Sequence, residues 1–293
     1  LSGNLTIPVP KKRRRGSEKK LRVVGARENN LKDIDVAFPL ECMVCVSGVS
    51  GSGKSSLVQE IIYNGLASLI HKSTKPIGQC DNISGGEHFD KVVNIDQSPL
   101  GQSPRSTPAT IMGIFDHIRQ LFARMPDARV RGLTPGRFSF NRPGGRCESC
   151  TGLGLRCIEM HFLPDVWIRC DVCQGKRYMK ETLQIQFKGR NISDILNLTV
   201  SSAILLFDNI ANIRDSLRVM EDVGLGYLSL GQPSTTFSGG EAQRLKLAGE
   251  LARPETGNTL YVMDEPTTGL HFADVQKLLQ VIQQLVNGGN TVI

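Results

Sequence analysis

The sequence lacks any hydrophobic run close to the roughly 20 residues that a membrane-spanning helix needs, so we expect no membrane span. It also lacks a signal peptide, because its first apolar stretches are short and interrupted by prolines and charges. Without a secretion signal, its eight cysteines indicate metal ligands or free thiols rather than disulfides. We therefore expect a cytoplasmic protein. An initiating methionine is absent too, which suggests a fragment.

The 293 residues, 40% of them apolar, suffice for one large domain or two ordinary ones with a hydrophobic core. The formal charge of +7 favours polyanionic partners. Near the start, a basic block follows two prolines and runs from Lys11 to Arg15. It is predicted to be a solvated linker, with a phosphate-contacting arm or a localisation signal as alternatives.

Residues 48–55 fit the phosphate-binding loop pattern of Gly, four residues and Gly-Lys-Ser. Its glycines let backbone N–H groups point at a phosphate chain, and the next helix presents its positive N-terminus to the same anion. Lys54 can reach the β- and γ-phosphates, and the Ser55 hydroxyl can hold Mg²⁺. A predicted strand over 42–47 and a predicted helix over 56–63 make an accidental glycine-rich turn a poor alternative. The predicted nucleotide-binding residues of this loop are Gly48, Ser50, Gly51, Ser52, Gly53, Lys54, Ser55 and Ser56.

Two further predicted strands end in polar side chains. The strand over 92–97 ends in Gln97, which can reach the metal or water of a nucleotide. The strand over 259–265 ends in Asp264, which suits Mg²⁺ through water, and in Glu265, which can activate the attacking water. A plain surface Asp-Glu pair fits less well, because ligands bind at the carboxyl edge of such a sheet.

The stretch Ser238-Gly239-Gly240-Glu241 begins a predicted helix and forms a second anion-binding arrangement. Alone it is a weak signal, but the Asp-Glu strand that follows strengthens it. A similar stretch over 83–87 precedes Gln97, which is too early in the chain, and we predict only a turn there.

Two Cys-x-x-Cys pairs have the spacing of a four-cysteine zinc site: Cys147, Cys150, Cys170 and Cys173. Because four thiolates leave no open coordination position, the zinc is predicted to be structural, with reduced metal-free thiols as the alternative. Glycines beyond the pairs suit turns with unusual backbone angles: Gly152, Gly154 and Gly175. Cys42 and Cys45 have the same spacing, but on a strand they point to opposite faces.

Residues 111–125 are predicted to form an amphipathic, core-packing helix. Five arginines follow, with Phe138 and Phe140 between them: Arg129, Arg131, Arg137, Arg142 and Arg146. They can track a phosphate backbone or form a solvated surface, and both interpretations stay open. Trp167 is predicted to pack rather than stack on bases. Residues 192–222 and 272–286 are predicted helical, with Thr199 and Asn212 as N-caps in the first region.

In this order, the nucleotide motifs resemble those of ABC-type ATPases. The expected fold class is therefore α/β, an ABC-type P-loop ATPase core with a zinc-binding insertion and a helical signature subdomain. More specific stretches resemble the UvrA family, namely residues 95–99, 137–141, 144–147, 160–165 and 264–271. The resemblance covers the second nucleotide-binding half of that family almost end to end. The predicted domains are a basic linker (1–20), an ATP-binding core (21–110 and 258–293), a zinc-bearing insertion (111–191) and a helical signature subdomain (192–257).

The resemblance implies an ATPase of bacterial nucleotide excision repair that binds duplex DNA, detects damage and loads UvrB. ATP, Mg²⁺ and Zn²⁺ are its implied cofactors. It further implies two nucleotide-binding halves that close face to face, and a dimer of two copies. Lys54 and Ser55 would then serve one ATP, whereas Ser238, Gly239 and Gly240 would serve another. Glu265, Lys54 and Gln97 are the implied catalytic residues, and the basic block becomes the connector between halves.

The chain departs from the family pattern in places. Phe237 stands where the family usually has Leu, and the first half and a γ-phosphate-sensing histidine after Ile293 are missing. We therefore expect weak ATP hydrolysis by the chain alone. One rival hypothesis is the ATPase subunit of an ABC membrane transporter, which leaves the zinc site and the basic charge unexplained. Another is a chaperone-type zinc module, against which the flanking nucleotide motifs argue.

Overall fold

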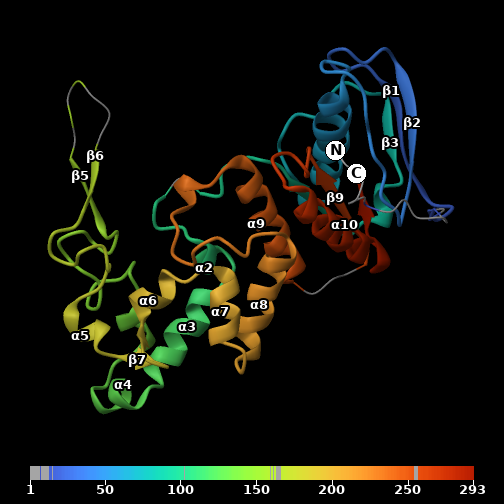
Figure 1. Cartoon of the computed structure of the whole chain (residues 1–293). Coiled ribbons are helices and arrows are strands. Elements are labelled where there is room, and N and C mark those ends of the chain that lie inside the picture. Colours follow the sequence, from blue (N-terminus) through green and yellow to red (C-terminus); the bar gives the residue numbers. More distant parts are fainter. Residues whose placement is uncertain are drawn as a thin grey trace, which may run out of the picture. The chain divides into compact units, whose positions relative to one another are not determined.

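The computed structural model describes residues 7, 13–14, 16–101, 103–158, 160, 162, 166–253 and 257–293. Most of the basic block over 11–15 and part of the stretch over 160–165 therefore lie outside the described residues. The chain divides into two compact units (Figure 1): Leu1–Gln97 with Arg253–Ile293, and Ser98–Ala252. The predicted domain boundaries differ from this division and stay predictions.

The described part of the first unit contains an antiparallel and a parallel sheet. In the antiparallel sheet, β1 (Lys20–Ala26) lies between β2 (Ile34–Pro39) and β3 (Asn82–Ser84). In the parallel sheet, β9 (Thr259–Met263) lies between β4 (Lys91–Ile95) and β10 (Thr291–Val292).

The predicted strand before the phosphate loop joins the parallel sheet through a single bridge, from Met43 to Val292. The Val44 N–H donates to the Val292 carbonyl at 2.8 Å. Extended alternation persists, since Cys42 is buried and Cys45 is exposed. The prediction of a full strand over 42–47 was thus wrong, although the chain direction is parallel to β10 as a nucleotide-binding sheet requires.

A continuous helix after the loop packs between the two sheets. It begins as the π-helix η1 (Ser56–Tyr63) and continues as α1 (Asn64–His71). Ile61 and Leu66 share one core with Leu21 of β1 and with Leu260 and Val262 of β9. Burial of each such side chain stabilises the fold by about 1.5–3 kcal/mol. This core fixes where the helix begins, and therefore where the phosphate loop lies.

Two other predictions for the first unit are confirmed. α10 (Phe272–Asn287) is the helix expected over 272–286, with its buried side chains at helical spacing: Leu278, Val281, Ile282 and Leu285. The stretch over 83–87 ends β3, turns at Gly85 and enters the 3₁₀ helix η2 (Gly86–His88). Gly85 has φ +89°, and a Cβ there would lie 2.2 Å from the Lys20 carbonyl oxygen, so the glycine is a requirement of packing.

The second unit is mainly helical. Its elements are α2 (Pro108–Ile111), α3 (Ile114–Ala123), α4 (Pro126–Val130), η3 (Pro135–Phe138), β5 (Leu155–Ile158), β6 (Val166–Arg169), α5 (Lys180–Leu183), β7 (Gln186–Phe187), β8 (Arg190–Asn191), α6 (Ile192–Leu196), α7 (Val200–Leu206), α8 (Ala211–Asp222), η4 (Ser234–Thr236) and α9 (Gly239–Leu251). Strands β5 and β6 pair into an antiparallel hairpin that extends away from the helices of this unit (Figure 1).

The helix predicted over 111–125 is interrupted. Gly113, with φ +71°, separates α2 from α3, so the amphipathic helix begins at Ile114. Its buried side chains pack against the two aromatic residues of the arginine-rich stretch. Phe140 lies 5.0 Å from Phe115, and Phe138 lies 5.5 Å from Phe122, between ring centroids. These two phenylalanines are therefore core residues and cannot interleave with a nucleic acid.

One predicted N-cap is confirmed and one is wrong. Thr199 caps α7, because its Oγ1 accepts the Ser202 N–H at 3.2 Å. Asn212 lies inside α8, whose N-cap position is Ile210. In the described part of the chain, no helix is both long and apolar enough to cross a bilayer.

Candidate functional site

The phosphate loop is organised around the Lys54 ammonium group. Its Nζ donates to the carbonyl oxygens of Gly48 and Val49, both at 2.9 Å. Gly51 and Gly53 adopt left-handed backbone angles, with φ of +77° and +90°. A Cβ on Gly53 would lie 2.7 Å from the Leu31 side chain. The glycines of the motif are thus required by backbone geometry, as expected for a loop that turns its N–H groups inward.

The serines of the loop differ in their surroundings. Ser50, Ser52 and Ser55 are exposed, and Ser55 occupies the N-cap position of η1. Ser56 is buried, and its hydroxyl accepts a hydrogen bond from Asn29 Nδ2 at 2.9 Å. Ser55 is therefore open to a ligand, whereas Ser56 is engaged by the protein.

Three predicted site segments leave the parallel sheet at one edge. Strands β4 and β9 run parallel, with Ile95 opposite Met263, so Gln97 and Asp264 follow the same ends of neighbouring strands. The segment through Met43 is parallel to β10 and leads into the phosphate loop. Carboxyl ends of parallel strands gather at one edge, which is where ligands bind in such sheets. The topology of the first unit therefore brings Lys54, Gln97 and the Asp264-Glu265 pair to a common edge.

Glu265 has an unusual backbone. Its φ is +43°, a left-handed value that costs a non-glycine residue free energy. A turn supports it, since the Thr268 N–H donates to the Glu265 carbonyl at 3.0 Å and the Thr268 hydroxyl donates to its carboxylate at 3.2 Å. The carboxylate is thus held beside the sheet edge in a conformation that a regular strand would not give.

Ser238 begins α9 in the second unit. The Ser238 Oγ accepts the Glu241 N–H at 3.3 Å, and the Glu241 carboxylate accepts the Ser238 N–H at 2.8 Å, which makes a capping box. Gly239 and Gly240 form the first turn of the helix. This places small residues at the positive end of a 13-residue helix, as predicted for an anion-binding arrangement.

Tyr227 supports this capping box, although no local sequence pattern marks it. Its hydroxyl donates to the Glu241 carboxylate at 2.8 Å and accepts from Arg244 at 3.3 Å. Burial and the neighbouring Glu241 carboxylate raise the pKa of Tyr227. The phenol stays protonated, so it remains available as the donor that orients Glu241.

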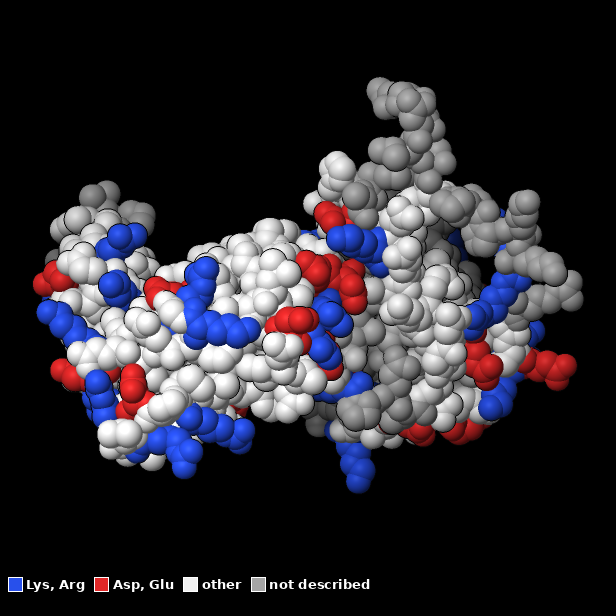
Figure 2. All heavy atoms as spheres, turned by 60° about the horizontal axis from the view of Figure 1, so that its bottom comes forward, with Lys and Arg blue, Asp and Glu red and all other residues white. Residues whose placement is uncertain are grey.

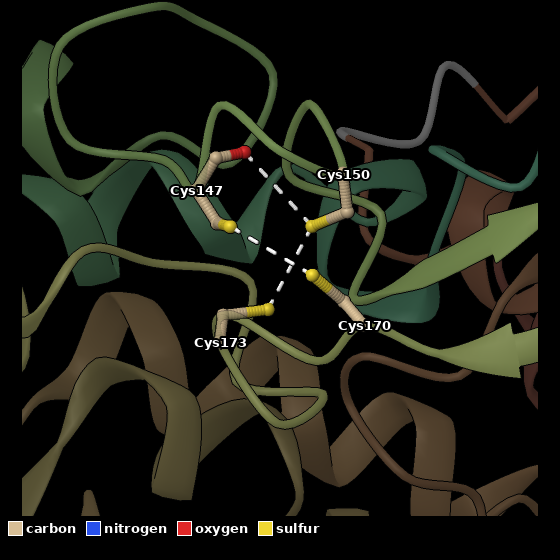
Figure 3. Close-up of side chains that lie close together, drawn as sticks. All are labelled: Cys147, Cys150, Cys170 and Cys173. Carbon is tan, nitrogen blue, oxygen red and sulfur yellow. Dashed lines mark hydrogen bonds between the residues drawn. The ribbon is translucent and has the colours of Figure 1, made fainter.

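The four predicted zinc ligands converge on one point (Figure 3). Their thiol sulfurs all lie within 4.8 Å of one another, and all four residues are buried: Cys147, Cys150, Cys170 and Cys173. Cys147 Sγ lies 4.0 Å from Cys170 Sγ, and Cys150 Sγ lies 3.7 Å from Cys173 Sγ. Zinc–sulfur bonds of about 2.3 Å in a tetrahedron separate the sulfurs by about 3.8 Å. The cluster therefore fits one tetrahedral zinc ion.

The thiols are not equivalent without metal. Burial opposes ionisation of Cys170, but the N–H groups of Cys173 and Val172 outweigh it and lower its pKa to about 7. Burial raises the pKa of Cys173 to about 12 and also raises that of Cys150. A bound zinc ion would replace the protons that these thiols otherwise hold.

Each cysteine pair and the turn after it form a knuckle, and the glycines predicted for these turns have the expected left-handed angles. They are Gly152 (φ +83°), Gly154 (φ +77°) and Gly175 (φ +80°). A Cβ on Gly152 would lie 1.8 Å from the Phe140 carbonyl oxygen. The Gly154 N–H donates to Cys150 Sγ at 3.2 Å. These left-handed turns thus favour glycine, and a side chain at Gly152 or Gly154 would also meet neighbouring backbone.

The hairpin between the cysteine pairs exposes apolar side chains on both strands. Trp167, which was predicted to pack, is 50% exposed and lies opposite Cys157. Phe162 is 98% exposed. Other exposed apolar residues of this region are Leu155, Ile158, Val166 and Ile168. The prediction for Trp167 was therefore wrong, because a two-stranded ribbon has no second layer against which to pack.

The excess positive charge of the chain lies in one region. Residues 111–191 contain 14 Lys and Arg against 7 Asp and Glu, whereas the rest of the chain contains 21 of each. Arg129, Arg131 and Arg142 are exposed, while Arg137 and Arg146 are partly buried. Arg146 pairs with Glu148 at 3.1 Å. Figure 2 shows Lys and Arg side chains spread over the part of the second unit drawn at the left.

Known proteins are similar to this chain over its whole length. No protein-family model matches it. UvrABC system protein A of Methanothermobacter thermautotrophicus is 57% identical over all 293 residues, and that of Bacillus subtilis is 54% identical. The chain spans 30% and 31% of these relatives. The crystal structure of UvrA2 from Deinococcus radiodurans matches 98% of the chain and 35% of its own, with a TM-score of 0.90 and 47% identity. Over its whole length, the chain is therefore similar to one segment of the UvrA proteins, about a third of their own length.

Proposed function

We propose that the chain is the second nucleotide-binding half of a UvrA-type ATPase, which recognises damaged duplex DNA in nucleotide excision repair. The common sheet edge that collects the phosphate loop, Gln97 and the Asp264-Glu265 pair carries this proposal. The similarity to UvrABC system protein A over the whole chain supports it. The ABC-type core, the zinc-bearing insertion and the helical signature subdomain are the corresponding domains.

In this proposal the residues at the sheet edge share the chemistry of ATP hydrolysis. The loop N–H groups and Lys54 bind the phosphates, and Ser55 and Asp264 hold Mg²⁺. When bound, Mg²⁺ neutralises the charge that develops on the transferred phosphoryl group. Gln97 orients the attacking water, and the Glu265 carboxylate accepts its proton. The turn at Thr268 keeps that carboxylate in place.

The signature residues serve a different ATP from the phosphate loop. Ser238, Gly239 and Gly240 would meet the nucleotide bound by the other half when the two halves close, with the helix end of α9 facing the phosphates. The working protein then requires the other nucleotide-binding half and a second copy, with UvrB as the protein that it loads. For this reason we expect the chain alone to hydrolyse ATP slowly.

Duplex DNA would lie against the zinc-bearing insertion. The excess positive charge of residues 111–191 supports this, since phosphate neutralisation dominates the affinity for DNA. Exposed Arg129, Arg131 and Arg142 are the candidate phosphate contacts. Trp167 and Phe162 offer exposed rings for unstacked bases at a distorted site. An ABC membrane transporter subunit would share the nucleotide chemistry, but it has no use for this basic, zinc-bearing region.

The test uses a full-length chimera, in which this chain replaces the matching segment of the Bacillus subtilis relative. ATP hydrolysis is measured without DNA, with undamaged duplex and with the same duplex carrying one bulky lesion. We expect the two duplexes to change the rate to different extents. A chimera that hydrolyses ATP at one rate in all three conditions would overturn the proposed role in damage recognition.

A further inference from the structure

Two arginines of the second unit connect the cysteine knuckles to segments that belong to the nucleotide motifs in sequence. Arg105 follows Gln97 by eight residues and contacts the knuckle of Cys147 and Cys150. Arg177 follows Cys173 by four residues and contacts the loop that leads to Ser238. We call residues 147–175, which contain the four clustered cysteines, the zinc module. Each arginine therefore joins this module to the protein segment beside one nucleotide motif.

Arg105 makes a forked contact with the first knuckle. Its Nη1 donates to the Thr151 carbonyl at 3.0 Å, and its Nη2 donates to the Thr151 hydroxyl at 3.0 Å. Nη1 also lies 3.4 Å from the Asn141 side-chain oxygen. Thr151 directly follows Cys150 and has φ +48°, so the arginine binds the strained turn of the knuckle itself. A planar guanidinium fixes the orientation of such a partner as well as its distance.

Arg177 joins the second knuckle, at Cys170 and Cys173, to the loop that precedes Ser238. Its Nη2 donates to the Gly231 carbonyl at 2.9 Å, and its guanidinium lies 5.1 Å from the centroid of the Phe140 ring. Its own carbonyl accepts the Cys147 N–H at 2.8 Å. The residue thus contacts both cysteine knuckles and the loop before α9.

The two segments that the arginines hold are bonded to each other. The Ser234 N–H donates to the Ser106 carbonyl at 2.8 Å, and the Ala109 N–H donates to the Leu230 carbonyl at 3.1 Å. Ser234 is buried, and its hydroxyl donates to the Ser103 carbonyl at 3.3 Å. Residues 103–109 and 230–234 therefore form one hydrogen-bonded layer, which the arginines attach to the zinc module at two points.

We propose that Arg105 and Arg177 are positioning residues that make the zinc module follow the nucleotide state of the layer formed by residues 103–109 and 230–234. This inference rests on the proposed function, because it requires that ATP and DNA bind to the same protein. Gln97 precedes one segment of the layer and Ser238 follows the other, so nucleotide contacts at either residue displace the layer. The forked contact of Arg105 and the ring contact of Arg177 transmit that displacement to the knuckles. The coordination of the zinc site need not change.

The experiment measures duplex affinity of the chimera with and without a non-hydrolysable ATP analogue. The ratio of the larger to the smaller of the two dissociation constants reports the effect of nucleotide on DNA binding. We expect Arg105→Gln with Arg177→Gln to reduce this ratio by on the order of fivefold or more, within the usual range of coupling between sites. Arg105→Lys and Arg177→Lys keep the charge but not the fork, so they should recover only part of the ratio.

Arg214→Gln is the matched control. Arg214 bonds with Asp208 and Asp215 of its own region, far in sequence from both knuckles, so the ratio should stay unchanged. Zinc content and ATP hydrolysis without DNA are measured for every variant. Arg105→Gln decides the outcome if the Arg177 variants lose zinc, because Arg105 contacts the knuckle at Thr151 and not at a zinc ligand.

The possible outcomes separate the two proposals. If the unsubstituted chimera neither hydrolyses ATP nor binds duplex, the proposed function fails; if it does both but binds duplex equally with and without the analogue, the positioning role is wrong. If its affinity depends on nucleotide and Arg105→Gln keeps the full ratio while retaining zinc, the positioning role is wrong. A drop in duplex affinity that is equal in both nucleotide states would also overturn it, because it would show a purely structural effect.

Discussion

The first unit and the part of the second that carries the four-cysteine cluster are stabilised by different means. In the first unit, one helix between two sheets buries a core of aliphatic side chains from η1, β1, β4 and β9. In the cysteine-cluster part, the four cysteines form a buried cluster of their own, and the hairpin between them is exposed on both strands. The first region is therefore held by the hydrophobic effect, and the second depends on what its thiols bind.

This difference matches the chemistry proposed for each region. The sheet gives a rigid edge, on which acid–base residues need accurate placement. The zinc module has little core of its own and presents a basic, partly apolar surface, which suits a large polyanion. A substitution that unfolds one region should therefore leave the other region folded.

The largest expected effect concerns the sheet edge. Glu265→Gln should lower ATP hydrolysis of the chimera by about 100-fold or more, because the amide cannot accept the proton of the attacking water. ATP binding and zinc content should stay unchanged, and both are measured beside the rate. Asp274→Asn, at an acidic residue in the first turn of α10, is the control. Unchanged turnover in Glu265→Gln would remove this residue from its proposed role.

Zinc is the next test of the comparison. Metal analysis should find about one ion per chain, and Cys170→Ser should remove it, since three thiolates no longer close the tetrahedron. Hydrogen exchange should then accelerate in residues 140–180 and stay unchanged in β1, β4 and β9. Cys45→Ser, at an exposed cysteine outside the cluster, should keep the metal. If Cys170→Ser retained its zinc, or if exchange rose throughout the first unit, the two regions would not be independent.

A smaller effect is expected from the basic surface. Arg129→Glu with Arg142→Glu should weaken duplex binding by the chimera and flatten its dependence on salt, by about 0.9 in logarithmic slope for each phosphate that is no longer neutralised. Both residues are exposed, so stability should change little. Arg22→Glu with Arg218→Glu makes the same charge change at exposed sites outside residues 111–191. Equal weakening by the two pairs would indicate a general charge effect and no defined surface.

Local motifs were predictable where a short stretch carries its own geometric requirement. The cysteine spacing predicted a cluster, and the turn glycines have the left-handed angles that such knuckles need. The apolar runs before Gln97 and Asp264 predicted β4 and β9, because buried parallel strands are apolar on both faces. Longer motifs resemble the UvrA family, and sequence identity over the whole chain confirms that similarity.

Other features were missed because they depend on residues far apart in the chain. Asn212 resembles an N-cap by type, but packing begins α8 earlier, after Ile210. Trp167 resembles a core residue, but half of its side chain is exposed on the hairpin. Tyr227 reaches Glu241 across a loop, and no local pattern marks Tyr227.

The sequence alone determined the glycine-rich loop over 48–55, the four-cysteine cluster and the acidic pair that follows β9, since each needs particular residue types at fixed short spacing. Only the tertiary structure decided that Gln97, Asp264 and the loop share one sheet edge, and that Arg105 and Arg177 meet the knuckles. Strand order and side-chain contacts between distant segments follow from how the whole core packs, and no short stretch of sequence contains that information.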